Sequence, residues 1–181
     1  MPKGTARSAC VVAVLLLVGC GSRDSAPGRA AAGGLTLEAL QNASYRVSLV
    51  PEGVRLSNGR FREAAEADSV ATITVTLQDS LTSVGDLDGD GVVDAAVVLI
   101  ASGGGSGSFR ELAAVLNQDG TPRHVASAPL GDRVRVLSTA FRAGRIEVRM
   151  LDHGPGDPLC CPSVDTVRTY ALEGHRLKQV P

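Results

Sequence analysis

The sequence predicts one domain that is all-β or a β-dominated α+β fold: a single antiparallel sheet or sandwich with a short N-terminal helix. Short apolar segments recur at close intervals, and turn dipeptides of the Asn-Gly and Asp-Gly type separate several of them. In residues 72–77, threonines alternate with Ile73, Val75 and Leu77, which is the period-two pattern of a half-buried strand. With no tryptophan and 3% aromatic residues, the core must come from Val, Leu, Ile and Ala.

The beginning of the chain predicts secretion and attachment to lipid. Two basic residues, Lys3 and Arg7, precede an apolar run over residues 9–18 that is too short to span a bilayer. The run leads into Leu-Val-Gly-Cys, ending at Cys20, which resembles the lipobox of bacterial lipoproteins. This resemblance implies that residues 1–19 are a lipoprotein signal peptide and that the lipid on Cys20 anchors the protein in the cell envelope, at the outer membrane if the cell is Gram-negative. An ordinary signal peptide with an incidental cysteine is the alternative.

Composition divides the rest of the chain into a tether and a domain. Residues 21–34 are rich in Gly, Ser and Ala, so the segment 20–34 is expected to be a lipidated cysteine followed by a flexible tether. Residues 35–181 are long enough for one β-rich globular domain with its own core. The net charge of −1 gives no basic face for nucleic acid.

The first half of the domain predicts one helix and then strands. Residues 35–43 favour a short helix with Thr36 as its N-cap. Residues 62–69 are polar and rich in Ala and Glu, which favours a loop. Strands are expected at 45–49, 54–56 and 72–77.

The second half predicts strands throughout. Residues 109–117 have the composition of a helix or a strand, and the Asp-Gly turn that follows favours a strand. Residues 102–108 are expected to be a flexible connection; a phosphate-binding loop is the alternative, but the Gly-Lys-Ser/Thr ending is missing. Further strands are expected at 95–101, 124–130, 134–141, 146–151, 164–172 and 176–180.

A cluster of aspartates predicts a calcium loop. Carboxylates this close repel one another unless a cation lies among them. In a loop of this spacing Gly91 allows the sharp turn, and the Val92 carbonyl is a further ligand. An EF-hand would have glutamate at the position of Val97, and here an apolar, strand-like run follows instead. We therefore expect one structural Ca²⁺ with side-chain ligands from Asp86, Asp88, Asp90 and Asp94.

The Asp-x-Asp-Gly-Asp-Gly-x-x-Asp pattern of this loop resembles the loops of FG-GAP and VCBS-type repeats and, more distantly, dockerin loops. A propeller would need several copies of the loop, and the sequence has one. An Asp/Gly-rich surface turn without a metal is the alternative.

A second unusual stretch, residues 153–162, contains a pair of adjacent cysteines between prolines and glycines. The Cα atoms of neighbouring residues lie ~3.8 Å apart, below the usual disulfide range of ~4.4–6.8 Å. A bond between Cys160 and Cys161 would therefore be strained and comparatively easy to reduce. Two buried thiols are a second interpretation. A zinc or Cu(I) site formed by both thiolates and His153 is the third.

Several segments together resemble a group of bacterial secreted proteins and lipoproteins without an assigned biochemical role. These segments are the aspartate loop with its following apolar run, Gly-Ser-Gly-Ser-Phe, Leu-Gly-Asp-Arg-Val and His-Gly-Pro-Gly-Asp-Pro-Leu-Cys-Cys-Pro. The resemblance implies a compartment and a shared fold, and it implies no activity.

Three functions remain open from the sequence. The first is a non-enzymatic envelope lipoprotein with a structural calcium ion, anchored through Cys20, whose further partner would be a protein or a glycan. The second is a periplasmic thiol-redox or copper/zinc-binding protein that uses Cys160 and Cys161. The third is a metal-assisted hydrolase. No catalytic set of residues can be named for it in the sequence, which argues against this function. We favour the first.

Overall fold

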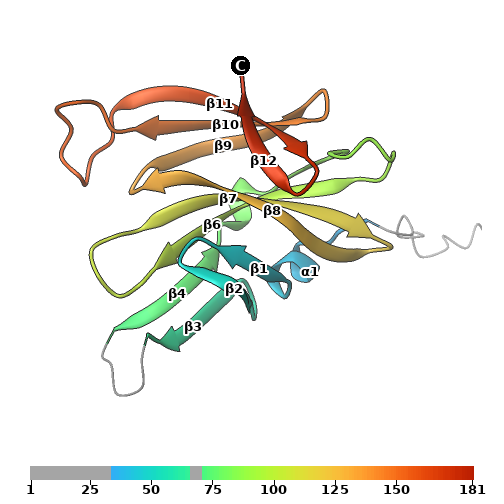
Figure 1. Cartoon of the computed structure of the whole chain (residues 1–181), viewed down its shortest axis with the longest axis horizontal. Helices are drawn as coiled ribbons and strands as arrows, with labels where there is room; N and C mark the ends of the chain where they lie inside the picture. The colour runs from blue at the N-terminus through green and yellow to red at the C-terminus, as the bar shows by residue number, and fades with distance from the viewer. Residues whose placement is uncertain (1–33, 66–70) are drawn as a thin grey trace, which may run out of the picture.

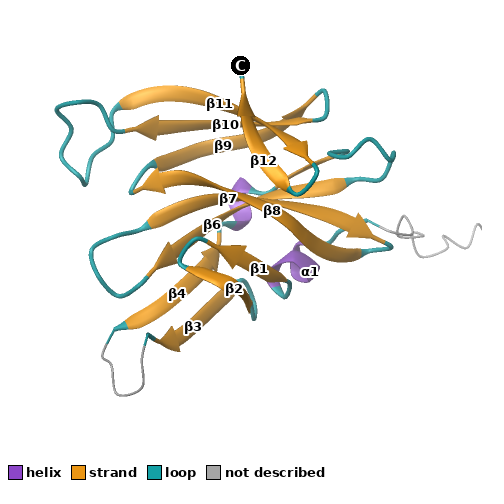
Figure 2. Ribbon diagram, in the orientation of Figure 1, coloured by secondary structure: helices purple, strands orange, loops and turns teal. Residues whose placement is uncertain are grey.

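The structure, a computed structural model, describes residues 34–65 and 71–181. Within these residues the fold is made of strands with one short α-helix, which confirms the β-dominated prediction (Figure 2). The predicted signal peptide, the lipid site at Cys20 and most of the tether lie outside the described residues.

The helix and strands follow one another with short connections. The helix α1 spans Leu37–Gln41, and a 3₁₀ turn spans Asp79–Leu81. The strands are β1 (Ser44–Val47), β2 (Val50–Arg55), β3 (Arg60–Ala64), β4 (Thr72–Leu77), β5 (Ser83–Gly85), β6 (Asp94–Ser102), β7 (Phe109–Gln118), β8 (Thr121–Asp132), β9 (Arg135–Arg142), β10 (Arg145–Asp152), β11 (Val164–Glu173) and β12 (Arg176–Val180).

The strands form three antiparallel sheets. The largest has six strands in the order β3-β4-β6-β7-β8, with β5 paired to β6 beside β4. A four-stranded sheet has the order β12-β11-β10-β9, and β1 and β2 form a separate hairpin. The four-stranded sheet lies on one side of β6, β7 and β8, and the β1–β2 hairpin with α1 lies on the other (Figure 1).

The central strand β6 contributes to two hydrophobic cores. Its odd-numbered residues, such as Val97, pack with Leu40 and Tyr45 in the core under α1 and the β1–β2 hairpin. Its even-numbered residues, such as Val98, pack with Ile146 in the core under the four-stranded sheet. Because both faces are covered, the strand is a continuous apolar run rather than an alternating one.

Apart from the exact bounds of strands, two predicted elements differ from the structure, and one short strand was not predicted. The helix is shorter than residues 35–43, because Thr36 caps its first turn and Asn42 ends it. The loop prediction for 62–69 is wrong at residues 62–64, which belong to β3 and pair with β4. This strand was missed because it is an edge strand with mostly exposed, polar side chains. The three-residue β5 was also missed, and it is recognisable only by its pairing with β6.

The strand order of the six-stranded sheet ends at β3 and β8, and the three-residue β5 pairs with β6 alone. The edge strand β3 exposes Arg60, Arg62 and Glu63. The edge strand β8 contains Pro122 and Pro129, and proline is tolerated in a strand at the edge of a sheet because it has no N–H to donate.

Candidate functional site

The aspartate loop is the connection of a β-hairpin. Residues 86–93 join β5 to β6, and Gly85 is paired with Asp94 at the base of the loop. Because β6 is the central strand, the loop is attached directly to the most buried element of the described chain.

Three of the four predicted side-chain ligands meet in the folded loop. One carboxylate oxygen each from Asp86, Asp88 and Asp94 lies within 4.8 Å of the others. Asp90 is outside this group, and its carboxylate instead accepts a hydrogen bond from the Val92 N–H at 2.7 Å. The structure thus brings together a group of three carboxylates that could hold a metal ion.

Hydrogen bonds from the loop backbone orient these carboxylates. Asp86 accepts from the N–H of Gly89 at 2.7 Å and from that of Gly91 at 3.0 Å, one on each oxygen. Asp88 accepts from the N–H of Asp90 at 3.2 Å. Both glycines have a φ of +83°, a conformation that L side chains rarely adopt. The loop therefore curls around its own acidic side chains.

Asp94 connects the loop to two strands of the central sheet. Its side chain is buried, with 1% of the residue exposed. One oxygen accepts from the Leu87 N–H and the other from the Asn117 N–H at the end of β7, each at 2.9 Å. The Asn117 side chain in turn donates to the Val93 carbonyl at 3.2 Å. Asp94 is therefore a structural link as well as a candidate ligand.

The environment of Asp94 opposes its ionisation. Burial raises the pKa of its carboxyl group, and the negative charges of Asp88 and Asp90 raise it further. The two backbone N–H groups act against this shift. A bound cation would favour the ionised form, and a ligand set made of carboxylate oxygens suits a hard divalent cation.

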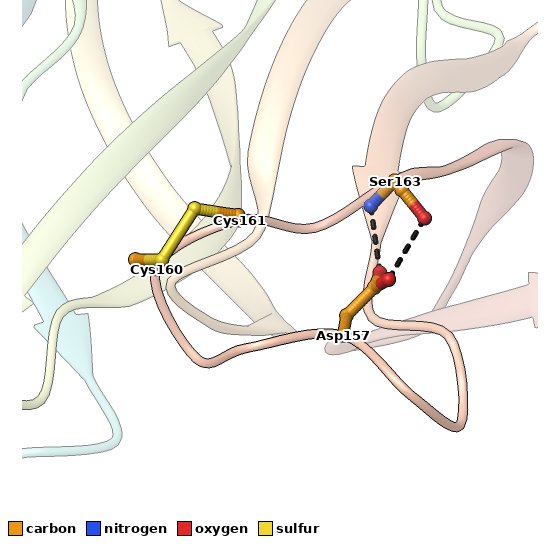
Figure 3. Close-up of a disulfide and its surroundings, with 4 residues drawn as sticks. All are labelled: Asp157, Cys160, Cys161 and Ser163. Carbon is orange, nitrogen blue, oxygen red and sulfur yellow. Dashed lines mark hydrogen bonds between the residues drawn. A yellow bond between two sulfur atoms is a disulfide. The ribbon is translucent and has the colours of Figure 1, made fainter.

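The cysteine pair lies in the β10–β11 connection and forms a disulfide between neighbouring residues (Figure 3). Both cysteines are exposed, so the interpretation as two buried thiols is wrong. The Cys161 N–H donates to the Pro158 carbonyl at 2.9 Å.

One carboxylate organises this disulfide loop. Asp157 accepts from the Gly154 N–H at 2.8 Å. It also accepts from the Ser163 N–H at 2.8 Å and from the Ser163 hydroxyl at 2.9 Å (Figure 3). The Gly154 N–H, followed by the Ser163 hydroxyl, lowers the pKa of Asp157. All these contacts lie within residues 153–163, so the loop is held by its own groups.

His153 does not join the two cysteines in a metal site. Its ring nitrogens are buried and have no hydrogen-bond partner. Among the described residues, the group of three aspartates is the one arranged to hold a metal ion. The soft-metal set predicted from His153, Cys160 and Cys161 is not brought together.

The hydrogen bonds of the Gly/Ser-rich segment at 102–108 do not support a phosphate-binding loop. The Ser108 N–H, a group that would face an anion, donates to the Asp132 carboxylate at 2.8 Å. The Ser102 hydroxyl donates to the Gly107 carbonyl at 3.1 Å, which closes the segment on itself.

Two buried polar residues that support the fold were missed in the sequence, and one of them, Asn117, contacts the aspartate loop. Asn117 supplies an N–H to Asp94, but 23 residues separate them and only strand pairing brings them together. Glu111 is 2% exposed, and it accepts from the Ser48 N–H at 2.6 Å, which fixes the β1–β2 turn to the central sheet. Its position within an apolar strand was the available signal.

Within residues 34–65 and 71–181, no helix has the length and apolar character needed to span a membrane. Comparisons with protein-family models, curated proteins and solved structures found no match to this chain, so its function is inferred from its own residues.

Proposed function

We propose that this protein is a lipid-anchored protein of the bacterial cell envelope, without enzymatic activity, whose β domain is stabilised by one Ca²⁺ in the aspartate loop. The observation that carries the calcium part is the convergence of Asp86, Asp88 and Asp94. An ion held there would stabilise the domain, because Asp94 also connects the start of β6 to the end of β7.

The ligand set supports calcium over other cations. Carboxylate oxygens are hard ligands, and they suit Ca²⁺ and Mg²⁺ better than metals that prefer sulfur or imidazole. Calcium accepts six to eight oxygens in flexible geometry, whereas magnesium keeps several of its waters. The Val92 carbonyl, Asp90 and water would complete the shell of a calcium ion.

The contacts of Asp94 support a structural rather than a catalytic ion. Each oxygen of Asp94 already accepts one backbone N–H, and its remaining lone pairs are free for an ion. An ion there would join the loop, β6 and β7 at one point. We propose that the protein uses the metal for stability and that its biological role lies in binding a protein or glycan partner.

The calcium proposal is tested by melting the full chain in EGTA and in millimolar Ca²⁺. An ion at 100 times its dissociation constant that binds only the folded state stabilises it by ~2.7 kcal/mol. We expect the melting temperature to rise by several degrees with calcium. Asp88→Asn should abolish the rise, because it removes a ligand charge but leaves an oxygen to accept the Asp90 N–H.

Two further variants complete this test. Asp165→Asn, at an exposed aspartate paired with Arg149, should respond to calcium like the unmodified protein. Asp90→Asn shows whether the fourth aspartate is a ligand. Identical melting curves in EGTA and calcium for the unmodified protein, with no calcium found by mass spectrometry, would refute the proposal.

The anchoring part is supported by the residues around Cys20 and is tested separately. We expect Cys20→Ala to move the protein from the membrane fraction to the soluble fraction of fractionated cells. One acyl chain binds membranes only marginally, so stable attachment needs the full lipid modification of this cysteine. A variant that still sediments with membranes would contradict the proposal.

A thiol-redox role is a second candidate, favoured by the exposure of both disulfide-bonded cysteines. In such a role a partner dithiol would reduce the Cys160–Cys161 bond and become a disulfide itself. Intact-mass analysis after alkylation, with and without a dithiol reductant, measures how readily the bond opens. A bond that stays closed at the concentration of reductant that opens exposed disulfides would argue against this role.

A further inference from the structure

A small hollow lies at the end of the central sheet where β7 begins and β8 ends. It has a volume of about 320 Å³, and its wall is mostly apolar, with Leu49 from the β1–β2 turn, Phe109 from β7 and Pro129 from β8. Glu111 of β7 also lines it. Phe109 and Glu111 are two residues apart in one strand, and Pro129 is paired with Glu111, so these side chains share one face of the sheet.

Two glycines of the segment 102–108 make room for the apolar wall. The Leu49 side chain lies over Gly103, where an added Cβ would be 3.7 Å from its nearest methyl carbon. An added Cβ on Gly107 would be 2.9 Å from the Phe109 Cζ atom, which is too close for the ring to keep its position. The ring of Phe109, with 40% of the residue exposed, is therefore placed beside the hollow by a glycine.

Glu111 is a buried carboxylate with a free oxygen at the hollow. The residue is 2% exposed, and its Oε1 atom accepts from the Ser48 N–H at 2.6 Å. Within residues 34–65 and 71–181 its Oε2 atom has no hydrogen-bond partner, and it is not one of the fully enclosed polar atoms, so it is accessible from the hollow that Glu111 lines. The ion pairs formed by the described residues do not include Glu111.

The other charged groups at the hollow interact with one another. The Arg110 guanidinium donates to the Ser108 carbonyl at 2.7 Å. Burial lowers the pKa of Arg110, and the nearby charge of Asp132 acts against this shift. Asp132 in turn pairs with Arg133 at 2.7 Å. In the described part of the chain, Glu111 is thus the charged group lining the hollow that lacks a counter-charge.

A buried carboxylate without a counter-charge is costly, and a cationic donor brought by a ligand would offset this cost. The surroundings of Glu111 restrict what that cation can be. A metal ion such as Ca²⁺ needs six to eight oxygen ligands, and the apolar wall does not supply them. An ammonium group on an apolar body matches both the free oxygen and the wall.

We propose that this hollow binds a small organic ammonium ion, a primary amine carried on an aromatic or branched aliphatic body. The ammonium group donates a charge-assisted hydrogen bond to the Glu111 Oε2 atom. The apolar body packs against Leu49, Phe109 and Pro129. The volume of the hollow lies at the lower end of the range of ~300–1,000 Å³ that is usual for small-molecule sites, so the ligand is small.

Binding is tested with the full chain by calorimetry and by amide chemical shifts. The probe is phenethylammonium, and 2-phenylethanol is a neutral control of nearly the same shape. We expect phenethylammonium to bind, with shifts at Ser48, Phe109 and Glu111, and the alcohol to bind at least about tenfold more weakly, since it lacks the charge. Glu111→Gln keeps an oxygen for the Ser48 N–H and should abolish this preference, whereas Phe109→Ala should weaken both ligands.

Two controls separate the hollow from general electrostatics and from calcium. Glu173→Gln changes an exposed glutamate outside the hollow, paired with Lys178, and should bind the amine normally. Asp88→Asn should also bind normally, because the aspartate loop contributes no residue to the hollow, so failure of the calcium proposal would leave this one standing.

Three results would overturn the proposal: equal binding of the amine and the alcohol, amine binding that is unchanged in folded Glu111→Gln, or no amine binding at millimolar concentration. If Glu111→Gln does not fold, the comparison of amine with alcohol in the unmodified protein and the loss in Phe109→Ala still decide the outcome.

Discussion

The aspartate loop and the disulfide loop use the same hydrogen-bonding device with different consequences. In each, a carboxylate accepts N–H groups from the backbone: Asp94 in the first and Asp157 in the second. The donors to Asp94 come from the loop and from β7, whereas the donors to Asp157 come from its own loop. The comparison indicates that the origin of the donors decides whether a carboxylate supports the whole domain or one connection.

The largest effect is expected from Asp94→Ala. This change leaves the N–H groups of Leu87 and Asn117 without their acceptor in a buried place. Each unsatisfied buried group costs about 1–3 kcal/mol, so we expect the free energy of unfolding to fall by about 2–6 kcal/mol. Urea denaturation without calcium measures this, which keeps the hydrogen bonds separate from any ion. A decrease in the free energy of unfolding of less than about 1 kcal/mol would contradict the conclusion that Asp94 supports the whole domain.

Asp157→Ala should have a smaller and local effect. The N–H groups of Gly154 and Ser163 lose their acceptor, but the loop is open to water, which replaces it. Hydrogen exchange should become faster within residues 153–163 and stay unchanged in β6 and β7. Faster exchange in those two strands would show that this loop also supports the central sheet.

Reduction of the disulfide should change global stability least. A bond between neighbouring residues closes almost no loop, so it removes little entropy from the unfolded chain. We expect the melting temperature to change by less than after calcium removal. The double variant Cys160→Ser with Cys161→Ser should melt like the reduced protein. A large drop in both would mean that the disulfide loop is coupled to the core.

The comparison also predicts opposite pKa shifts in the ion-free protein. Burial raises the pKa of Asp94, and hydrogen bonds lower that of Asp157. Asp157 therefore favours folding above its unfolded-state pKa, and this contribution is lost as the pH falls through its lower folded-state value. Asp94 has the opposite sign, because its folded form takes up a proton at a higher pH than its unfolded form. Carboxyl NMR titration in EGTA measures both values, and shifts in the same direction would contradict this account.

Features that depend on neighbours in sequence were predictable, and those that depend on pairing were not. The apolar run after Asp94 indicated a buried strand, and the spacing of the aspartates indicated that their side chains converge. No local pattern indicates that Asn117 would meet Asp94, because register between β6 and β7 decides it. Asp90 is a different case: its carboxylate accepts from the Val92 N–H, two residues away, and it lies outside the group of three carboxylates.

The charged edge strand β3 and the two prolines of β8 affect how readily copies of the protein aggregate. An unprotected sheet edge offers free N–H and C=O groups to a strand of another chain, which is a common start of aggregation. Arg60 and Arg62 place like charges against a second β3, and Pro122 and Pro129 remove donors from β8. A protein crowded on a membrane surface, as we propose for this one, would meet its own copies often, and these edges favour a dispersed population over fibrils.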